Sequence, residues 1–172
     1  KTLAGNTQGS KYNNRIDLYT TLNIINIIMK LNLTKPLVFF DLETTGVQVG
    51  SDHIVEICLL KVAVDGRVST YVQRVNPGMP IPPQSTEIHG ITDEMVRDKP
   101  TFKELSAEIA NFIGDSDLAG YNSNKFDIPL LVEEFLRVGI NFDVSNRKTI
   151  DVQNIFHKME PRTLKAAYKF YW

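Results

Sequence analysis

The chain has 172 residues, 42% of them hydrophobic, and a formal net charge of -1 at pH 7. This length and apolar content predict one soluble domain with a buried core. The slightly negative charge excludes a protein that binds nucleic acid through bulk basic character, so any polyanionic partner must be held by a local site. The single cysteine, Cys58, excludes a disulfide framework and favours a reducing cytoplasm.

The first residues differ in composition from the rest. The stretch Lys11–Asn32 is rich in Asn, Ile, Thr and Tyr and has no sustained period. Its apolar part, Ile24–Met29, is much shorter than the roughly 20 residues of a membrane span, and no signal peptide is visible. We interpret Met29 as the natural start, residues 1–28 as a disordered upstream extension, and residues 29–172 as a cytoplasmic domain without a membrane partner.

Three strands are expected next. The nearly continuous apolar run Leu37–Leu42 is typical of a strand covered on both faces. Two further strand-like runs, Ile54–Val64 and Val68–Val75, flank Asp65–Gly66, a pair that favours a two-residue hairpin turn because both positions tolerate positive φ. The proline-rich segment 76–85 (NPGMPIPPQS) then predicts a loop rather than a helix.

Helical signals follow this loop. Thr101 and Glu104 have the spacing of a capping box, apolar residues then recur on one face, and Gly114 supplies a stop. The segment 117–122 (DLAGYN) predicts a short strand. A second amphipathic helix is expected to begin with Asp127 as its N-cap.

The last segment repeats this alternation. Residues 147–156 (RKTIDVQNIF) predict a strand that ends near Asp151, followed by a helix. Three consecutive strands followed by alternating helix and strand predict an α/β fold, with a mixed sheet of about five strands and helices on both faces. We interpret Asp151 as a structural cap rather than a catalytic acid.

Two carboxylates, Asp41 and Glu43, stand one residue apart at the end of the first predicted strand. Side chains alternate in a strand, so both project to one side, where two like charges are unfavourable unless a cation or a proton intervenes. They can simply end the strand and face water. Their place before Gly46, at the end of a buried strand, is equally consistent with a ligand site. Asp127, which can also be only a cap, supplies a third carboxylate able to converge there.

Three motifs occur in order along the chain: 40–46 (FDLETTG), 89–92 (HGIT) and 122–127 (NSNKFD). Together they resemble the motifs of the DEDD superfamily of 3'-5' exonucleases, which includes the proofreading epsilon subunits of bacterial replicative polymerases. The resemblance covers the chain from Leu37 onward. It implies a ribonuclease-H-like fold, removal of nucleoside monophosphates from the single-stranded 3' end of DNA or RNA, and a DNA polymerase subunit as a partner.

The resemblance also assigns roles. By match to the family, Asp41 and Glu43 bind two divalent ions, Mg²⁺ or Mn²⁺, and Asp127 supports them largely through water. Carboxylates suit these hard ions, which can activate a water and stabilise the leaving oxygen. The residues that match positions along the terminal nucleotide, or in the shell supporting it, are Leu42, Thr44, Thr45, Gly46, His89, Asn122 and Phe126.

One departure from the family concerns its third motif, a His followed a few residues later by an Asp. This motif should follow the predicted helix 163–171 (TLKAAYKFY), and neither His53, His89 nor His157 replaces it by sequence logic. The missing general base is worth about 10² to 10⁴ in rate, and a fourth metal-binding carboxylate is missing too. We interpret the chain as an exonuclease domain truncated before this motif and its last sheet-covering helix, with little or no activity.

Two alternatives stay open. The first is a non-cleaving module of the same fold that binds nucleic acid or a polymerase. The second is a metal-dependent transferase that holds a nucleotide sugar with its Asp-x-acid pair, although this leaves the motif 122–127 unexplained. The preference for DNA or RNA does not follow from these residues. The aromatic side chains beside the motifs, Phe40, Tyr121 and Phe126, are expected to pack in the core.

Overall fold

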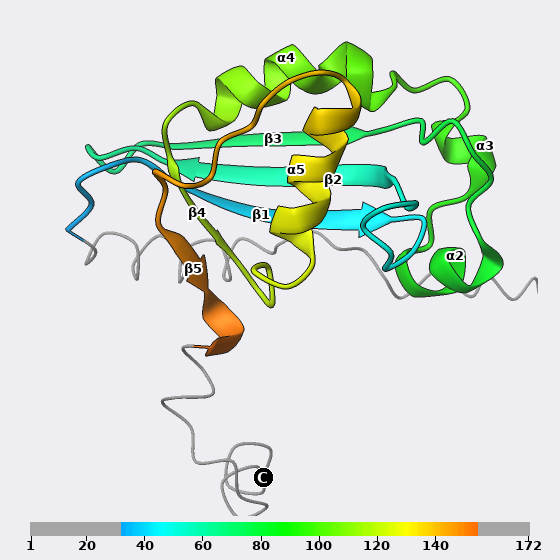
Figure 1. Cartoon of the computed structure of the whole chain (residues 1–172), viewed down its shortest axis with the longest axis horizontal. Helices are drawn as coiled ribbons and strands as arrows, with labels where there is room; N and C mark the ends of the chain where they lie inside the picture. The colour runs from blue at the N-terminus through cyan, green and yellow to red at the C-terminus, as the bar shows by residue number, and fades with distance from the viewer. Residues whose placement is uncertain (1–31, 155–172) are drawn as a thin grey trace, which may run out of the picture. The chain divides into compact units, whose positions relative to one another are not determined.

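The computed structural model describes residues 32–154, and the predictions for residues 1–28 and for the helices after Asp151 that carry His157 and 163–171 lie outside this range. Among the described residues, no helix is both long and apolar enough to cross a membrane. The elements in chain order are β1 (Leu37–Thr44), β2 (Ile54–Val62), β3 (Val68–Arg74), α2 (Pro83–His89), α3 (Asp93–Val96), α4 (Phe102–Ile113), β4 (Asp117–Gly120), α5 (Asp127–Arg137) and β5 (Thr149–Asp151) (Figure 1).

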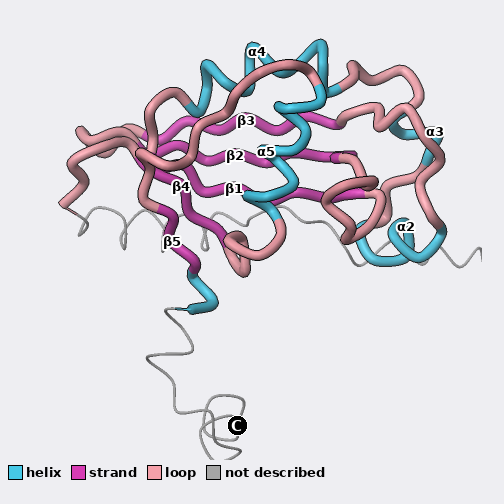
Figure 2. Tube along the Cα trace, in the orientation of Figure 1, coloured by secondary structure: helices cyan, strands magenta, loops and turns pink. Residues whose placement is uncertain are grey.

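The strands form one mixed sheet in the order β3-β2-β1-β4-β5 (Figure 2). β1, β2 and β3 pair antiparallel, whereas β4 runs parallel to β1 and β5 runs parallel to β4. The predicted α/β fold with a five-stranded mixed sheet is therefore confirmed. The register between β1 and β2 is regular from Leu37 opposite Val62 to Glu43 opposite Glu56, and it shifts after Glu43.

One face of β1 carries the core. Val38, Phe40 and Leu42 alternate along the strand and are buried against the long helices α4 and α5, which lie over the sheet in Figure 1. Within this cluster, the ring of Phe135 stacks on the ring of Phe142, with 4.6 Å between the two ring centroids. The helical members of this cluster are Phe102, Leu105, Ile109 and Ile113 of α4 and Ile128, Leu130, Leu131 and Phe135 of α5. Both described long helices thus cover the same face, opposite the odd-numbered side chains of β1.

Helix α4 forms as its sequence predicts. The backbone N–H of Thr101 donates to the Glu104 carboxylate (2.7 Å), and the Glu104 N–H donates to the Thr101 hydroxyl (3.4 Å), which completes the capping box. Gly114 ends the helix with φ of 59°, a value that favours glycine. The Lys61 ammonium donates to the Phe112 carbonyl (2.9 Å), so a cation stabilises the negative end of the helix dipole.

The hairpin between β2 and β3 is longer than predicted. The strands end and begin at Val62 and Val68, so five residues connect them instead of two. The Ala63 N–H donates to the Arg67 carbonyl and the Gly66 N–H donates to the Ala63 carbonyl, at 2.8 and 2.9 Å. Of these connecting residues only Gly66 has a positive φ, of 83°, whereas a two-residue type I′ turn needs two.

The proline-rich loop is shorter than predicted. Helix α2 begins at Pro83, inside the segment 76–85 that we expected to be irregular, and ends at Gly90 with φ of 75°. Proline is tolerated in the first helical turn because its missing N–H has no partner within the helix there. The single turn of α3, just beyond it, carried no recognised signal.

Candidate active site

The acidic pair lies on the sheet face opposite the core. Asp41 and Glu43 alternate with buried residues of β1, so both point to the side that α4 and α5 leave open, as predicted. The register places Asp41 opposite Cys58 and Glu43 opposite Glu56. Directly opposed residues on antiparallel strands share a face, so Glu56 of β2 adds a carboxylate that the sequence analysis did not single out.

The charges of this face act on one another. Burial raises the pKa of Glu43 from 4.5 to about 7, and the charges of Asp41, Glu56 and Asp127 add to this effect. The pKa of Asp41 is raised as well, by partial desolvation of its carboxyl group against the sheet and then by the charge of Glu56. Three separate segments therefore bring acids into one electrostatic neighbourhood.

Asp127 is not the helix cap that we expected. It is the first residue of α5, Phe126 occupies the N-cap position, and no side chain caps the helix. The Asp127 side chain is buried, and burial followed by the charge of Asp41 raises its pKa to about 6, although the backbone N–H groups of Asp127 and Leu42 favour its ionised form. A capping role therefore does not explain why an aspartate stands at position 127. The effect of the Asp41 charge on Asp127 suggests a role in the acidic site instead.

The acids of β1 and β2, together with Asp127 at the start of α5, suit a hard divalent ion. They are carboxylates whose charges repel one another, and a cation removes that repulsion. Among residues 32–154, no three acidic, histidine or cysteine side chains stand close enough together to form a ready-made metal group. Joint binding of one ion by Asp41, Glu43 and Asp127 would therefore need these side chains to move closer together.

The turn after β1 uses its own side chains. The Thr44 hydroxyl donates to the Gly46 carbonyl (2.7 Å), and the buried Thr45 hydroxyl donates to the Asp52 carboxylate (2.8 Å) while accepting the His53 N–H (3.0 Å). We expected Gly46 to allow close approach of a ligand. In the structure it is Asp52 that approaches, because a Cβ at Gly46 would lie 2.5 Å from the Asp52 carboxylate.

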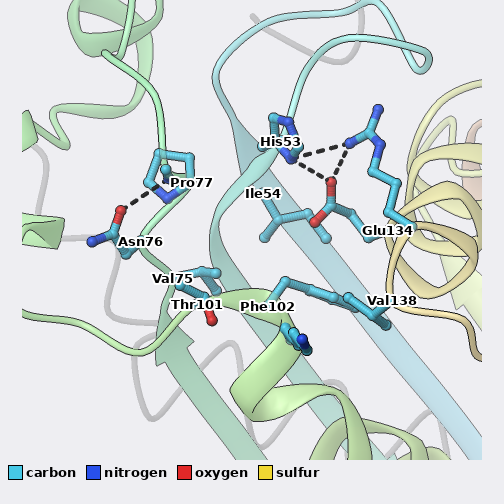
Figure 3. A pocket seen from close by; sticks show the side chains of 12 residues that line it. His53, Ile54, Val75, Asn76, Pro77, Thr101, Phe102, Glu134 and Val138 are labelled. Atoms are coloured by element: carbon cyan, nitrogen blue, oxygen red, sulfur yellow. Dashed lines mark hydrogen bonds and ion pairs between the residues drawn. The ribbon is translucent and has the colours of Figure 1, made fainter.

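Hydrogen bonds and ion pairs from α5, which sequence reasoning did not predict, stabilise the segment between β1 and β2 (Figure 3). The Arg137 guanidinium at the end of α5 donates to the backbone carbonyls of Asp52 and Val49, both at 2.8 Å. Glu134 is buried, pairs with Arg137, and lies 2.8 Å from the His53 ring. The only sequence signal is the spacing of Glu134 and Arg137, which puts them on one helix face but does not show what they bind.

His89 approaches the same turn from α2. Its Nδ1 accepts the Ile91 N–H (3.0 Å), so its Nε2 carries the proton and donates to the Thr44 carbonyl (3.2 Å). Burial lowers the pKa of His89, although the Thr44 carbonyl and Glu56 oppose this. Ser85 of the same helix donates to the Thr45 carbonyl (2.7 Å). The predicted site residues Thr44, Thr45 and His89 thus meet in one place.

The motif 122–127 is linked to β5 at its first residue. Asn122 has φ of 54°, and its N–H donates to Asp151 Oδ1 (3.0 Å). The same oxygen accepts the Gln153 N–H (3.0 Å), which agrees with our interpretation of Asp151 as structural. Asp151 also raises the pKa of Asp127 slightly through its charge. It therefore positions the loop that leads to Asp127.

The aromatic residues near the site divide into two groups. Phe40 is buried in the core and Phe126 packs against it, as expected, and Leu42 is also a core residue. The prediction for Tyr121 was wrong, since this residue is 63% exposed. Its position in the turn after β4 leaves the ring outside the apolar cluster.

Comparison with known proteins gives a consistent result. The family model described as "RNase_T: Exonuclease" matches residues 38–171. The chain is 39% identical over 109 residues to a DNA polymerase III subunit epsilon-like protein of Rhodobacter capsulatus, covering 62% of this chain and 15% of that protein. It is 29% identical over 150 residues to the DNA polymerase III subunit epsilon of Buchnera aphidicola, covering 82% of this chain and 59% of that protein. It thus spans less than two thirds of these relatives.

Solved structures share the fold. A product-bound structure of exonuclease I has a TM-score of 0.67 at 18% identity, with 78% of this chain and 36% of that chain covered. E. coli exonuclease I in complex with a dT13 oligonucleotide has a TM-score of 0.66 at 18% identity, with 77% of this chain and 33% of that chain covered. At this identity the likeness establishes the architecture, here a ribonuclease-H-like mixed sheet with helices.

Proposed function

Because the chain belongs to the RNase_T family of exonucleases, we propose that its site removes nucleoside monophosphates from the 3' end of single-stranded DNA or RNA. The observation that carries the proposal is the mutual charge effect of the acids on β1 and at the start of α5: burial and neighbouring acidic charge raise the pKa of Asp41, Glu43 and Asp127 alike. Such repulsion is unfavourable in an empty site and is relieved by divalent ions.

We assign the residues as follows. Asp41 and Glu43 hold Mg²⁺ or Mn²⁺, and Asp127 supports the ions largely through water. When bound, two such ions supply an activated water and stabilise the leaving oxygen of the phosphodiester. The polypeptide holds the strand end: the turn of residues 44–46, braced by Asp52 and His89, lies next to Glu43 and forms one wall for the terminal nucleotide.

The nucleic-acid substrate rests on chemistry and on relatives. Two structures of exonuclease I contain a dA13 or a dT13 oligonucleotide and a third is an ssDNA complex, which supports a single strand as the ligand here. Relatives described as polymerase III subunits support a polymerase as a partner. Asn122 and the neighbouring Tyr121 stand on the loop that leads to Asp127, where an incoming base can meet them.

Mononucleotide release from a 5'-labelled oligothymidylate in Mg²⁺ or Mn²⁺ tests the proposal. A chain extended past Trp172 with the third motif of a relative is expected to cleave. In the extended chain, Asp41→Asn should abolish release, whereas Asp65→Asn, an equal charge change in the exposed hairpin, should not.

The outcomes separate the candidate functions. Cleavage by the extended chain that survives Asp41→Asn would refute the proposed site. Metal-dependent binding of the oligonucleotide without cleavage, in the original and the extended chain alike, would favour the non-cleaving module of the same fold. Binding of a nucleotide sugar in place of the oligonucleotide would favour the transferase.

A further inference from the structure

Three charged residues form a row across the sheet beside the candidate site. The register places Glu43 of β1 opposite Glu56 of β2, and Glu56 opposite Arg74 of β3. Directly opposed residues of antiparallel strands point to the same side of a sheet, so all three side chains share the face opposite the core. The row runs acid, acid, base, with Arg74 at its outer end.

Arg74 is the only basic residue on this face of the five described strands. Lys61, the other basic residue of β2 or β3 outside this row, has the opposite parity and donates to the Phe112 carbonyl of α4. Asp41, Glu43 and Glu56 all belong to the face of Arg74. Of the described strands, only β3 therefore presents a cation, Arg74, to a polyanion that approaches the acids from this side.

The guanidinium is held in place but stays accessible. Arg74 Nε donates to a Glu56 carboxylate oxygen at 3.1 Å, and the two side chains are 41% and 29% exposed. An ion pair this open contributes little to stability, so folding alone does not explain it. Among residues 32–154, Arg74 contacts an acid only through Nε, and the fork of its two terminal nitrogens has the geometry that matches phosphate oxygens.

We propose that Arg74 binds a backbone phosphate of the single-stranded nucleic acid whose 3' end lies at Asp41 and Glu43, and that Glu56 orients it for this contact. Two strand spacings of about 4.8 Å place Arg74 roughly 10 Å from Glu43, which suits a phosphate upstream of the scissile bond. The inference rests on the proposed function, because it needs the strand end at the acids. It adds a phosphate-binding position on β3.

A competing explanation gives Arg74 a purely internal role. In that case it serves only to neutralise Glu56, whose charge raises the pKa of Asp41 and Glu43. The two explanations differ in what salt does to binding. Each phosphate that a protein cation neutralises adds about 0.7 to the slope of log K against log salt for a single strand. An arginine that touches only Glu56 adds nothing to this slope.

The test measures binding of a fluorescein-labelled oligothymidylate to the full chain by anisotropy, with Ca²⁺ fixed and KCl varied. Arg74→Gln should reduce the magnitude of the slope by about 0.7, which at 0.1 M salt corresponds to roughly fivefold weaker binding. Arg67→Gln is the matched control: it removes the same charge from the other end of the β2–β3 hairpin, where Arg67 is 84% exposed. It should leave the slope unchanged.

Two further variants separate contact from support. Arg74→Lys retains the charge and should restore most of the slope, whereas Glu56→Gln should leave the slope intact. Thermal unfolding of each variant confirms that it is folded. An unchanged slope in Arg74→Gln, or equal losses in Arg74→Gln and Arg67→Gln, overturns the inference and leaves the proposed function standing. A wild-type chain that does not bind the oligonucleotide overturns both.

Discussion

The charge repulsion at the acidic face predicts that Glu43→Gln stabilises the metal-free protein at alkaline pH. The pKa of Glu43 rises from 4.5 to about 7 on folding because the site desolvates the carboxylate and places Asp41, Glu56 and Asp127 near it. At a pH between these two pKa values, the folded chain binds more protons at Glu43 than the unfolded chain does. The free energy of unfolding therefore falls as the pH increases through this window.

The magnitude follows from the shift. A fully desolvated group with this pKa change would cost about 3 kcal/mol of stability at pH 8, at about 1.4 kcal/mol for each factor of ten. Glu43 is only half-buried, so solvent screening reduces the cost to about 1–2 kcal/mol. The free energy of unfolding of the variant should then exceed that of the wild type by about that amount at pH 8, and the two should be equal near pH 5.

Urea unfolding in EDTA at pH 5 and pH 8 measures this difference. Glu87→Gln, a change at an exposed position of α2, is the control and should show no such dependence on pH. In saturating Mg²⁺ the wild type should be more stable than the variant at pH 8, because binding of the cation stabilises the wild type more than it stabilises the variant. A variant that is less stable than the wild type by the same amount at both pH values would refute the repulsion argument.

Two further predictions concern the turn after β1. Arg137→Ala should destabilise the protein by about 2–4 kcal/mol in urea unfolding, because it leaves the buried Glu134 without its cation; Arg137→Lys, which cannot span both carbonyls, should recover only part, and full recovery would contradict the forked contact. Gly46→Ala should cost about 1–3 kcal/mol, since its Cβ would meet the Asp52 carboxylate at 2.5 Å. Adding Asp52→Ala should relieve part of that cost, and strictly additive losses would contradict this steric cause.

The predictable part of the structure is the part with a local cause. The capping box at Thr101 and the stop at Gly114 depend on residues within one turn of the helix, and both appear as expected. The common side of Asp41 and Glu43 depends only on the alternation of a strand. The predicted N-cap at Asp127 failed because Phe126 precedes the helix instead. The N-cap position was therefore not decided by residue type alone.

The part that escaped prediction is held by contacts between distant segments. Arg137 reaches the Asp52 carbonyl across 85 positions of the chain, and no periodicity or motif connects the two residues. The same holds for the row of Glu43, Glu56 and Arg74, which exists only once the register of three strands is known. A shift of one residue in either pairing would move these side chains to the core face. The sequence could therefore indicate which acids matter, but not which basic residue faces them.

The proposed site would explain how a slightly acidic chain holds a polyanion. The core-facing side of β1 fixes the strand, so the opposite side can carry charges that contribute nothing to packing. The threonines of the turn are occupied by internal hydrogen bonds, so this turn offers a nucleotide a rigid backbone rather than free hydroxyls. In the proposed function, attraction comes from divalent ions at Asp41 and Glu43 and from the guanidinium of Arg74. Removal of either source should weaken binding separately, because the ions and Arg74 would neutralise different phosphates of one strand.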